Sequence, residues 1–190
     1  MKKLYVFNML SLDGFIARPN GDLDWHNTDE EFNDFAIEQL ENTGMILFGR
    51  VTYEMMASFW PTPEAIQTDP EVAAAMNSLP KLVYSTRLKK AVWNNSSLAV
   101  SILAQEVAEL KKGKGKDIAI FGSSTIVSAF AQLGLIDEYR LMVNPVVLGS
   151  GIPLFRGLDR DVRLTLLKTR AFRSGNILLY FTPHEKEIIR

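Results

Sequence analysis

The chain has 190 residues, of which 47% are apolar and 23% charged, and its formal net charge is −1. This is the composition of an ordinary globular domain with a sizeable core, and it gives no sign of a surface for nucleic acid or membrane. The sequence has no cysteine, which excludes disulfides, thiolate metal sites and a cysteine nucleophile. We expect one domain over residues 1–190 in the cytoplasm, because the N-terminal apolar run is too short for a signal peptide.

Short strands and helices alternate along the first two thirds of the chain. The apolar run Leu4–Leu10 predicts a buried strand, and Asp13-Gly14 marks the loop after it. Thr28-Asp29-Glu30-Glu31 has the pattern of a capping box, so we expect Thr28 to cap a helix that Gly44 ends. The later elements expected in this region are a strand at Met45–Phe48, a helix at Val51–Phe59, an irregular segment at Trp60–Val72, a helix at Val72–Leu79, a strand at Leu82–Tyr84, an ambiguous stretch at Val92–Val100, a helix at Ile102–Lys112, a strand at Ile118–Phe121 and a helix at Thr125–Leu133.

The last third of the chain is rich in strand signals. An extended strand with a proline-bearing bend is expected over Ile136–Gly151, and two long strands joined near Ser174-Gly175 predict a hairpin. The whole pattern predicts an α/β fold. We expect a single domain whose central sheet is mostly parallel, with antiparallel strands at the C-terminal end and helices on both faces.

The junction Gly122-Ser123-Ser124 joins a predicted strand directly to a predicted helix. The first amides of a helix lack intrahelical partners and carry partial positive charge, and glycine lets an anionic group approach the backbone. The junction could therefore hold a phosphate. The alternative is a tight turn in which serine caps the helix.

Two more predicted strands end in residues that could bind a phosphate. Gly49 is followed by Arg50 and Thr52 in the first turn of a helix, and another strand ends in Ser85-Thr86-Arg87. Three such ends at one sheet edge suggest a ligand with several phosphates, such as a dinucleotide with a 2′-phosphate. Neither a P-loop motif nor the G-x-G-x-x-G fingerprint occurs, which argues against a P-loop nucleotidase and a standard Rossmann dehydrogenase.

Motifs along nearly the whole chain resemble the dihydrofolate-reductase-like superfamily, and within it the C-terminal reductase of bifunctional riboflavin-biosynthesis proteins. The motifs that carry this resemblance are Ser11–Ala17, Leu47–Glu54, Val83–Arg87, Ile120–Phe130 and Leu135–Phe155. The resemblance implies an NADPH-dependent reductase, and a homodimer. It implies that the cofactor phosphates contact Gly49, Arg50 and Thr52, that the 2′-phosphate lies among Ser85, Thr86 and Arg87, and that the pyrophosphate lies at Gly122, Ser123, Ser124 and Thr125.

The chain departs from the riboflavin-pathway reductases in two segments that are expected to contact the substrate. These reductases usually carry a lysine where this chain has Phe7-Asn8-Met9-Leu10, and Glu-Gly-Gly where it has Phe121-Gly122-Ser123. We therefore expect a heterocycle other than their phosphoribosylated pyrimidine. The candidates to contact it are Asn8, a polar residue inside an apolar strand, and the possible pocket walls Trp25, Phe32, Met55 and Trp60, each of which could instead belong to the core.

Two acidic residues are the catalytic candidates. Dihydrofolate reductases place a carboxylate early in the first helix, after a tryptophan and one turn before an aromatic. Glu31 with Phe35 resembles this pattern, and Glu30 is the neighbouring candidate. Asp13 could assist as an acid or through a water. Their alternatives are an acid placed to suit the helix dipole and a turn residue before Gly14. Neither histidine has metal-ligand spacing, so no metal site is expected. The sequence thus predicts hydride transfer from NADPH to a small pterin- or pyrimidine-like ring; the alternative is a non-catalytic nucleotide-binding or dimeric scaffold domain.

Overall fold

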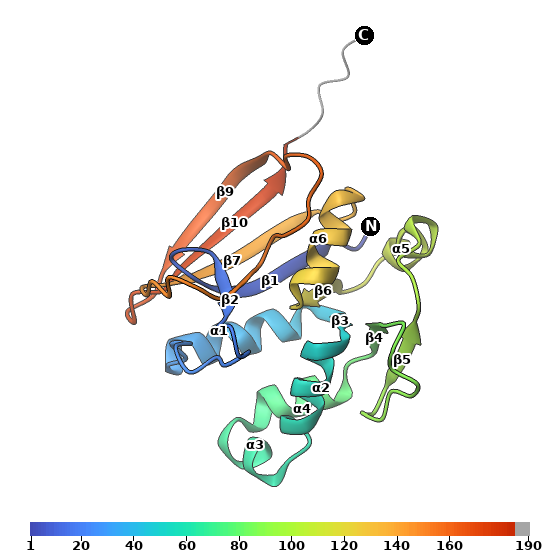
Figure 1. The fold of residues 1–190 in the computed structure, drawn as a ribbon. Helices are drawn as coiled ribbons and strands as arrows, with labels where there is room; N and C mark the ends of the chain where they lie inside the picture. Colours follow the sequence, from blue (N-terminus) through green and yellow to red (C-terminus); the bar gives the residue numbers. More distant parts are fainter. Residues whose placement is uncertain (185–190) are drawn as a thin grey trace.

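A central sheet of eight strands organises the chain, of which the computed structural model describes residues 1–184 (Figure 1). In spatial order its strands are β5 (Ser96–Ala99), β4 (Lys81–Tyr84), β3 (Thr43–Gly49), β6 (Asp117–Phe121), β1 (Leu4–Ser11), β7 (Glu138–Asn144), β10 (Ile177–Pro183) and β9 (Leu164–Ala171). The strands from β5 to β7 are parallel, whereas β10 runs antiparallel to β7 and to β9. This arrangement confirms the predicted fold class.

Helices cover both faces of the sheet, so the central strands β1, β3 and β6 are largely buried. These helices are α1 (Glu30–Glu41), α2 (Arg50–Phe59), α3 (Pro63–Thr68), α4 (Pro70–Ser78), α5 (Ala104–Lys111) and α6 (Ser124–Gln132). Alternate residues of β1 face opposite sides: Val6 packs in the core with Phe130 of α6, and Met9 packs with Phe35 of α1. A third cluster joins Tyr53 of α2 and Met76 of α4 to the sheet.

Helix α1 begins one residue later than expected and ends earlier. Its N-cap is Asp29, not Thr28, and the Asp29 carboxylate accepts a hydrogen bond of 2.9 Å from the backbone N–H of Phe32. The helix ends at Glu41, and Gly44 already belongs to β3. Both differences are shifts of a few residues at a helix end. Neighbouring residues can serve as cap or turn there, so helix boundaries are hard to predict to the residue.

Three segments hold structure that the sequence pattern did not predict. The stretch Trp60–Val72, expected to be irregular, contains α3 and the start of α4. Pro63 and Pro70 stand at the first position of these helices, where the missing N–H has no intrahelical partner to lose. The ambiguous stretch contains β5. The loop after β1 contains β2 (Phe15–Ala17), which pairs with β8 (Ile152–Pro153).

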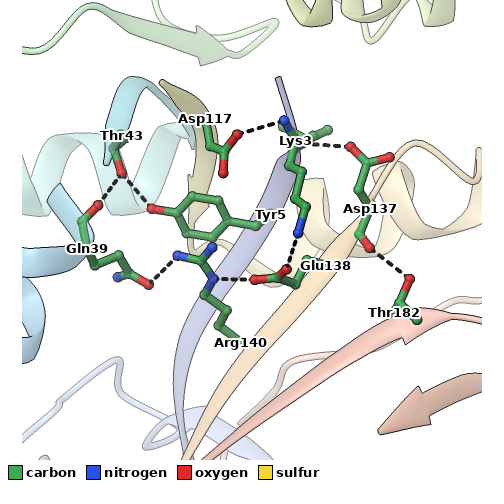
Figure 2. A network of polar contacts seen from close by, with 10 residues as sticks. Lys3, Tyr5, Gln39, Thr43, Asp117, Asp137, Glu138, Arg140 and Thr182 are labelled. Atoms are coloured by element: carbon green, nitrogen blue, oxygen red, sulfur yellow. Dashed lines mark hydrogen bonds and ion pairs between the residues drawn. The ribbon is translucent and has the colours of Figure 1, made fainter. Parts of the chain in front are cut away.

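A polar network closes the amino-terminal edge of the sheet (Figure 2). The Asp117 carboxylate accepts the backbone N–H of Lys3 at 2.8 Å. Glu138 is buried and forms ion pairs with Lys3 at 3.0 Å and with Arg140 at 2.6 Å. The Arg140 guanidinium lies 3.7 Å from the centre of the Tyr5 ring. These contacts tie the starts of β1, β6 and β7 together. The carboxyl-terminal edge of the sheet lies at the opposite ends of these strands.

Candidate functional site at the carboxyl-terminal edge

The turns after β3 and β6 meet at the carboxyl-terminal edge of the sheet. The two strands are parallel neighbours, with Leu47 opposite Ile120. A Cβ on Gly122 would lie 2.7 Å from Thr52 Oγ1, and Ser123 Oγ occupies the space that a Cβ on Gly49 would need. Gly122 also has a φ of 55°, which side chains disfavour. Glycine is therefore required for the two turns to touch.

The helices that start at these turns have open N-termini. Gly49 and Ser123 are the N-cap residues of α2 and α6. Gly49 has no side chain, and the Ser123 side chain makes no capping hydrogen bond within residues 1–184. Neither helix has an acidic residue in its first turn, whereas α1 has an Asp29 cap followed by Glu30 and Glu31. Two sets of free backbone N–H groups with the positive end of the helix dipole thus adjoin one another, and such ends favour an anion.

A cavity of about 370 Å³ lies beside these turns, between β1, α1, α2 and α4. Nine of the predicted cofactor and substrate residues line it: Asn8, Phe32, Thr52, Met55, Trp60, Gly122, Ser123, Ser124 and Thr125. The predicted residues that do not line it are Asp13, Trp25, Glu31, Gly49, Arg50, Ser85, Thr86 and Arg87. Ser85, Thr86 and Arg87 follow β4, the neighbour of β3, so they lie further along the same edge.

The floor of the cavity is apolar where the riboflavin-pathway pattern has polar residues. Phe7 and Phe121 are opposite one another in β1 and β6, and their ring centroids are 6.0 Å apart. Phe35 of α1 packs on the Phe7 ring at 5.6 Å. The two segments that depart from the riboflavin-pathway pattern therefore meet at the cavity, where Phe7 and Phe121 contribute aromatic rings and Asn8 an amide.

Two residues that line the cavity each have a buried side-chain atom without a hydrogen-bond partner within residues 1–184. Asn8 is 8% exposed, and its Oδ1 has no hydrogen-bond partner within residues 1–184. The same is true of His26 Nε2, and both residues line the cavity. Burial lowers the pKa of His26 to about 4, although a hydrogen bond with the Ile16 backbone opposes that shift. Trp25, predicted as a pocket wall, packs edge-on against the His26 ring at 4.5 Å instead.

The two predicted catalytic carboxylates are engaged elsewhere. Glu31 accepts the backbone N–H of Arg173 at 2.9 Å and lies 3.6 Å from the guanidinium of Arg170. Asp13 accepts the backbone N–H groups of Leu148 and Gly149 at 3.1 and 2.7 Å. A hydrogen bond with Ser11, followed by these backbone bonds, lowers the pKa of Asp13. Both carboxylates accept backbone N–H groups of loops, and neither is among the residues that line the cavity.

The cations at this edge differ from those expected. Arg50 points to Glu54, with 2.5 Å between the guanidinium and the carboxylate. Arg156 lines the cavity, and its backbone N–H donates to Ser128 Oγ of α6 at 3.1 Å. Sequence reasoning missed Arg156 although it directly follows the motif Leu135–Phe155, and it also missed Asp69, the one carboxylate among the lining residues.

Within residues 1–184, no group of three or more histidine and carboxylate side chains is arranged to hold a metal ion. No helix in the same range has the length and apolar character needed to cross a membrane.

The chain is similar to known proteins in sequence and in fold. The chain is 35% identical over 174 residues to the uncharacterized protein YyaP of Bacillus subtilis (strain 168), covering 90% of each chain. The crystal structure of a protein from Shewanella sp. PV-4 that is described as a riboflavin biosynthesis protein has the same fold. Its TM-score is 0.74 at 24% sequence identity, and the match covers 96% of this chain and 99% of that one. Dihydrofolate reductase from Enterococcus faecalis, solved with NADP(H) and RAB-propyl, shares the fold at a TM-score of 0.64 and 15% identity, covering 96% and 97%.

The family model described as the RibD C-terminal domain matches residues 2–178. With the fold and the edge geometry described above, this match confirms the superfamily that the sequence motifs indicated. The chain belongs to the RibD C-terminal domain family.

Proposed function

We propose that the protein is an NADPH-dependent reductase that transfers a hydride to a small heterocyclic ring. The observation that carries the proposal is the meeting of two open helix N-termini at Gly49 and Gly122 beside an apolar cavity. Such a site can hold the anionic part of a dinucleotide and seat its nicotinamide next to a flat substrate. The E. faecalis dihydrofolate reductase of the same fold was solved with NADP(H), which supports this cofactor.

The residues at the edge fit the phosphates of the cofactor. The N–H groups of α2 and α6 and the hydroxyls of Thr52, Ser124 and Thr125 are donors on one side of the cavity, and Arg156 adds a cation there. Ser85, Thr86 and Arg87 lie beyond them at the end of β4, where we place the 2′-phosphate. Gly122 keeps the space that the backbone needs to approach an anion.

The remaining walls suit a flat ring. Phe32, Met55 and Trp60 line the cavity from α1 and from the end of α2, over the aromatic floor of Phe7 and Phe121. When bound, NADPH supplies the hydride, so no protein nucleophile is needed. The chain's own part is to orient the two rings face to face and to keep water from the reacting carbon.

Binding and turnover test this proposal separately. NADPH titrated into the protein should quench tryptophan fluorescence, since Trp60 lines the cavity. NADPH oxidation is then followed against a panel of pterins, pyrimidines and related bicyclic rings. A chain that binds NADPH and reduces none of them would favour the alternative, a non-catalytic nucleotide-binding or dimeric scaffold. A chain that binds no NADPH would overturn the cofactor assignment.

The homodimer stays a prediction. Support comes from the outer strand of the sheet, β9, which exposes Leu166 and Leu167 at 51% and 53%. Size-exclusion chromatography with light scattering measures the mass in solution, and a mass of one chain would contradict the dimer.

A further inference from the structure

Methionine is the chain's sole source of sulfur. The sequence has seven methionines and no cysteine, so no thiol competes with a thioether for an oxidant. Two methionines are exposed, Met1 at 89% and Met55 at 38%. The others are buried or partly buried: Met9, Met45, Met56, Met76 and Met142. Met1 stands at the chain terminus, whereas Met55 lines the apolar cavity. An oxidant in solution therefore reaches one thioether of the candidate site far more readily than the rest.

Helix α2 explains why two adjacent methionines differ. Met55 shares an outward face with Val51 and Phe59, one turn to either side, which are 63% and 41% exposed. Met56 packs on the core cluster at the inner side of the helix, and its sulfur accepts a hydrogen bond of 3.1 Å from the Trp60 indole N–H. That hydrogen bond engages a sulfur lone pair, and oxidation needs a free one. The structure thus exposes the first thioether and shields the second.

We propose that Met55 is a modification site, at which an oxidant of the peroxide class converts the thioether to a sulfoxide and thereby weakens the binding of flat apolar rings in the cavity. The sulfur lone pair attacks one peroxide oxygen, the O–O bond breaks and an S–O bond forms. Sulfur is oxidised by two electrons. The departing hydroxide takes the proton of the attacked oxygen and leaves as water. The effect on ring binding rests on the proposed function, since it takes the ring to be the substrate.

The sulfoxide changes the wall on which the ring would pack. Met55 stands with Phe32 and Trp60 among the apolar residues of the cavity. A thioether is flexible and polarizable, which suits contact with an aromatic face. A sulfoxide oxygen is polar, and a ring packed over it would displace its water without replacing the lost hydrogen bonds. Oxidation should therefore weaken ring binding and spare the helix N-termini, which we propose hold the cofactor phosphates.

The modification can be reversed by reduction. A methionine sulfoxide reductase removes the oxygen as water while two thiols are oxidised to a disulfide. Met55 is exposed, so such an enzyme can reach it in the folded protein. The cavity would then lose and regain ring binding with the supply of oxidant and reductant.

Peptide mapping by mass spectrometry tests the site directly. After brief treatment of the folded protein with hydrogen peroxide, Met55 should gain an oxygen at least about 10-fold faster than its neighbour Met56. It should also react faster than Met76 and Met142, which are 2% and 0% exposed, and Met1 gives the rate of an exposed thioether. In urea, where burial is lost, the rates should converge. A Met55 that reacts no faster than Met56 in the folded protein would overturn the proposal.

Three variants test the effect on the cavity, each compared with its own untreated sample. Peroxide should raise the KM of the wild type for a reduced ring at least about 5-fold and leave its Kd for NADPH unchanged. In Met55→Leu, which has no sulfur there, peroxide should leave the KM unchanged. Met56→Leu is the matched control and should respond as the wild type does. Untreated Met55→Gln, with a polar group of similar length, should have the raised KM of the oxidised wild type.

Repair of the oxidised wild type completes this test. A methionine sulfoxide reductase with dithiothreitol should restore its KM. A Met55→Leu protein as sensitive to peroxide as the wild type would refute the effect on ring binding.

The mapping and the kinetics fail separately. Selective oxidation of Met55 in a chain that never oxidises NADPH would retain the modification site and reject the reductase, and with it the effect on ring binding. Reduction of a ring by a chain whose Met55 and Met56 react equally would retain the reductase and reject the modification site.

Discussion

Thr52 of α2 lies against Gly122 of the β6–α6 turn, so closely that a Cβ on Gly122 would come within 2.7 Å of the Thr52 hydroxyl oxygen. The two residues are 70 positions apart in the sequence. Their contact brings the N-termini of α2 and α6 together. The proposed binding of the NADPH phosphates depends on this contact.

Gly122→Ala should therefore weaken NADPH binding by at least about 10-fold and lower the free energy of unfolding by about 1–3 kcal/mol. The added methyl meets Thr52 and must adopt a φ of 55°. Fluorescence titration and urea unfolding measure the two effects. Gly134→Ala is the control at the other end of α6, where φ is 68° and a Cβ would meet nothing within 4 Å. It should cost stability by about 1–2 kcal/mol and leave NADPH binding unchanged.

Arg87→Ala should weaken NADPH by about 1.5–3 kcal/mol and hardly affect NADH, because only NADPH carries the 2′-phosphate. The residue follows β4, and its backbone N–H donates to Ser85 Oγ at 3.1 Å, which shapes this turn. Dissociation constants for both cofactors measure the difference. Lys89→Ala, a nearby change of the same charge, should affect neither cofactor. Equal losses for NADPH and NADH would assign the 2′-phosphate to other residues.

Glu31→Gln should leave the turnover rate unchanged. The Glu31 carboxylate holds the backbone of Arg173 and the guanidinium of Arg170 rather than facing the cavity. The ion pairs are partly exposed, so we expect a loss of stability below about 1 kcal/mol. Steady-state kinetics with a substrate from the ring panel checks this. If turnover slowed by about 10-fold or more while thermal stability stayed the same, Glu31 would be restored as a catalytic residue.

Acid should destabilise the protein through His26. Burial lowers the pKa of His26 from 6.5 to about 4, so between these pH values the unfolded chain binds a proton that the folded chain does not. The free energy of unfolding should then fall by up to about 1.4 kcal/mol for each unit that the pH drops in this window. Urea unfolding at several pH values gives the slope. His26→Phe should reduce this slope, and an unchanged slope in that variant would contradict the prediction.

Glu138→Gln should destabilise the fold without affecting the cofactor. The carboxylate is buried at the amino-terminal edge, where it accepts hydrogen bonds from Arg140 and Lys3 (Figure 2). Burial raises the pKa of Glu138, but these hydrogen bonds outweigh burial and lower it overall. Losing one partner of a buried pair costs about 3 kcal/mol. Thermal unfolding and NADPH titration measure both effects, and Glu109→Gln, in an exposed pair with Lys112, is the control that should change neither.

The sequence predicted those parts of the fold that depend on short-range signals. The strand, glycine turn and helix over 118–133 were recognisable because an apolar run, a glycine and a helical period follow one another directly. The hairpin at β9 and β10 was recognisable because Ser174-Gly175 separates two long runs of strand-forming residues. The sequence pattern did not predict α3 because the segment around it is rich in proline, although proline at the first helical position, as at Pro63, is favourable.

The site was less predictable because its geometry depends on distant parts of the chain. Glu31 has a helical spacing that suits catalysis, but its orientation is set by Arg170 and Arg173, which reach it from the far hairpin. His26 and Arg156 lie in loops, where no periodic pattern marks a residue as facing a cavity. Asn8 could be identified because a polar residue in an apolar strand is conspicuous in the sequence itself.

The position of β1 in the middle of the sheet has a consequence for the growing polypeptide. In the sheet, β1 pairs with β6 and β7, so Leu4 faces Ile118 and Tyr5 faces Glu138. At a synthesis rate of about 5–20 residues per second, the apolar N-terminal segment emerges from the ribosome on the order of ten seconds before either neighbour exists. During that interval it is a natural target for chaperones, and a nascent chain that stalls before β6 would carry an unpaired strand prone to aggregate.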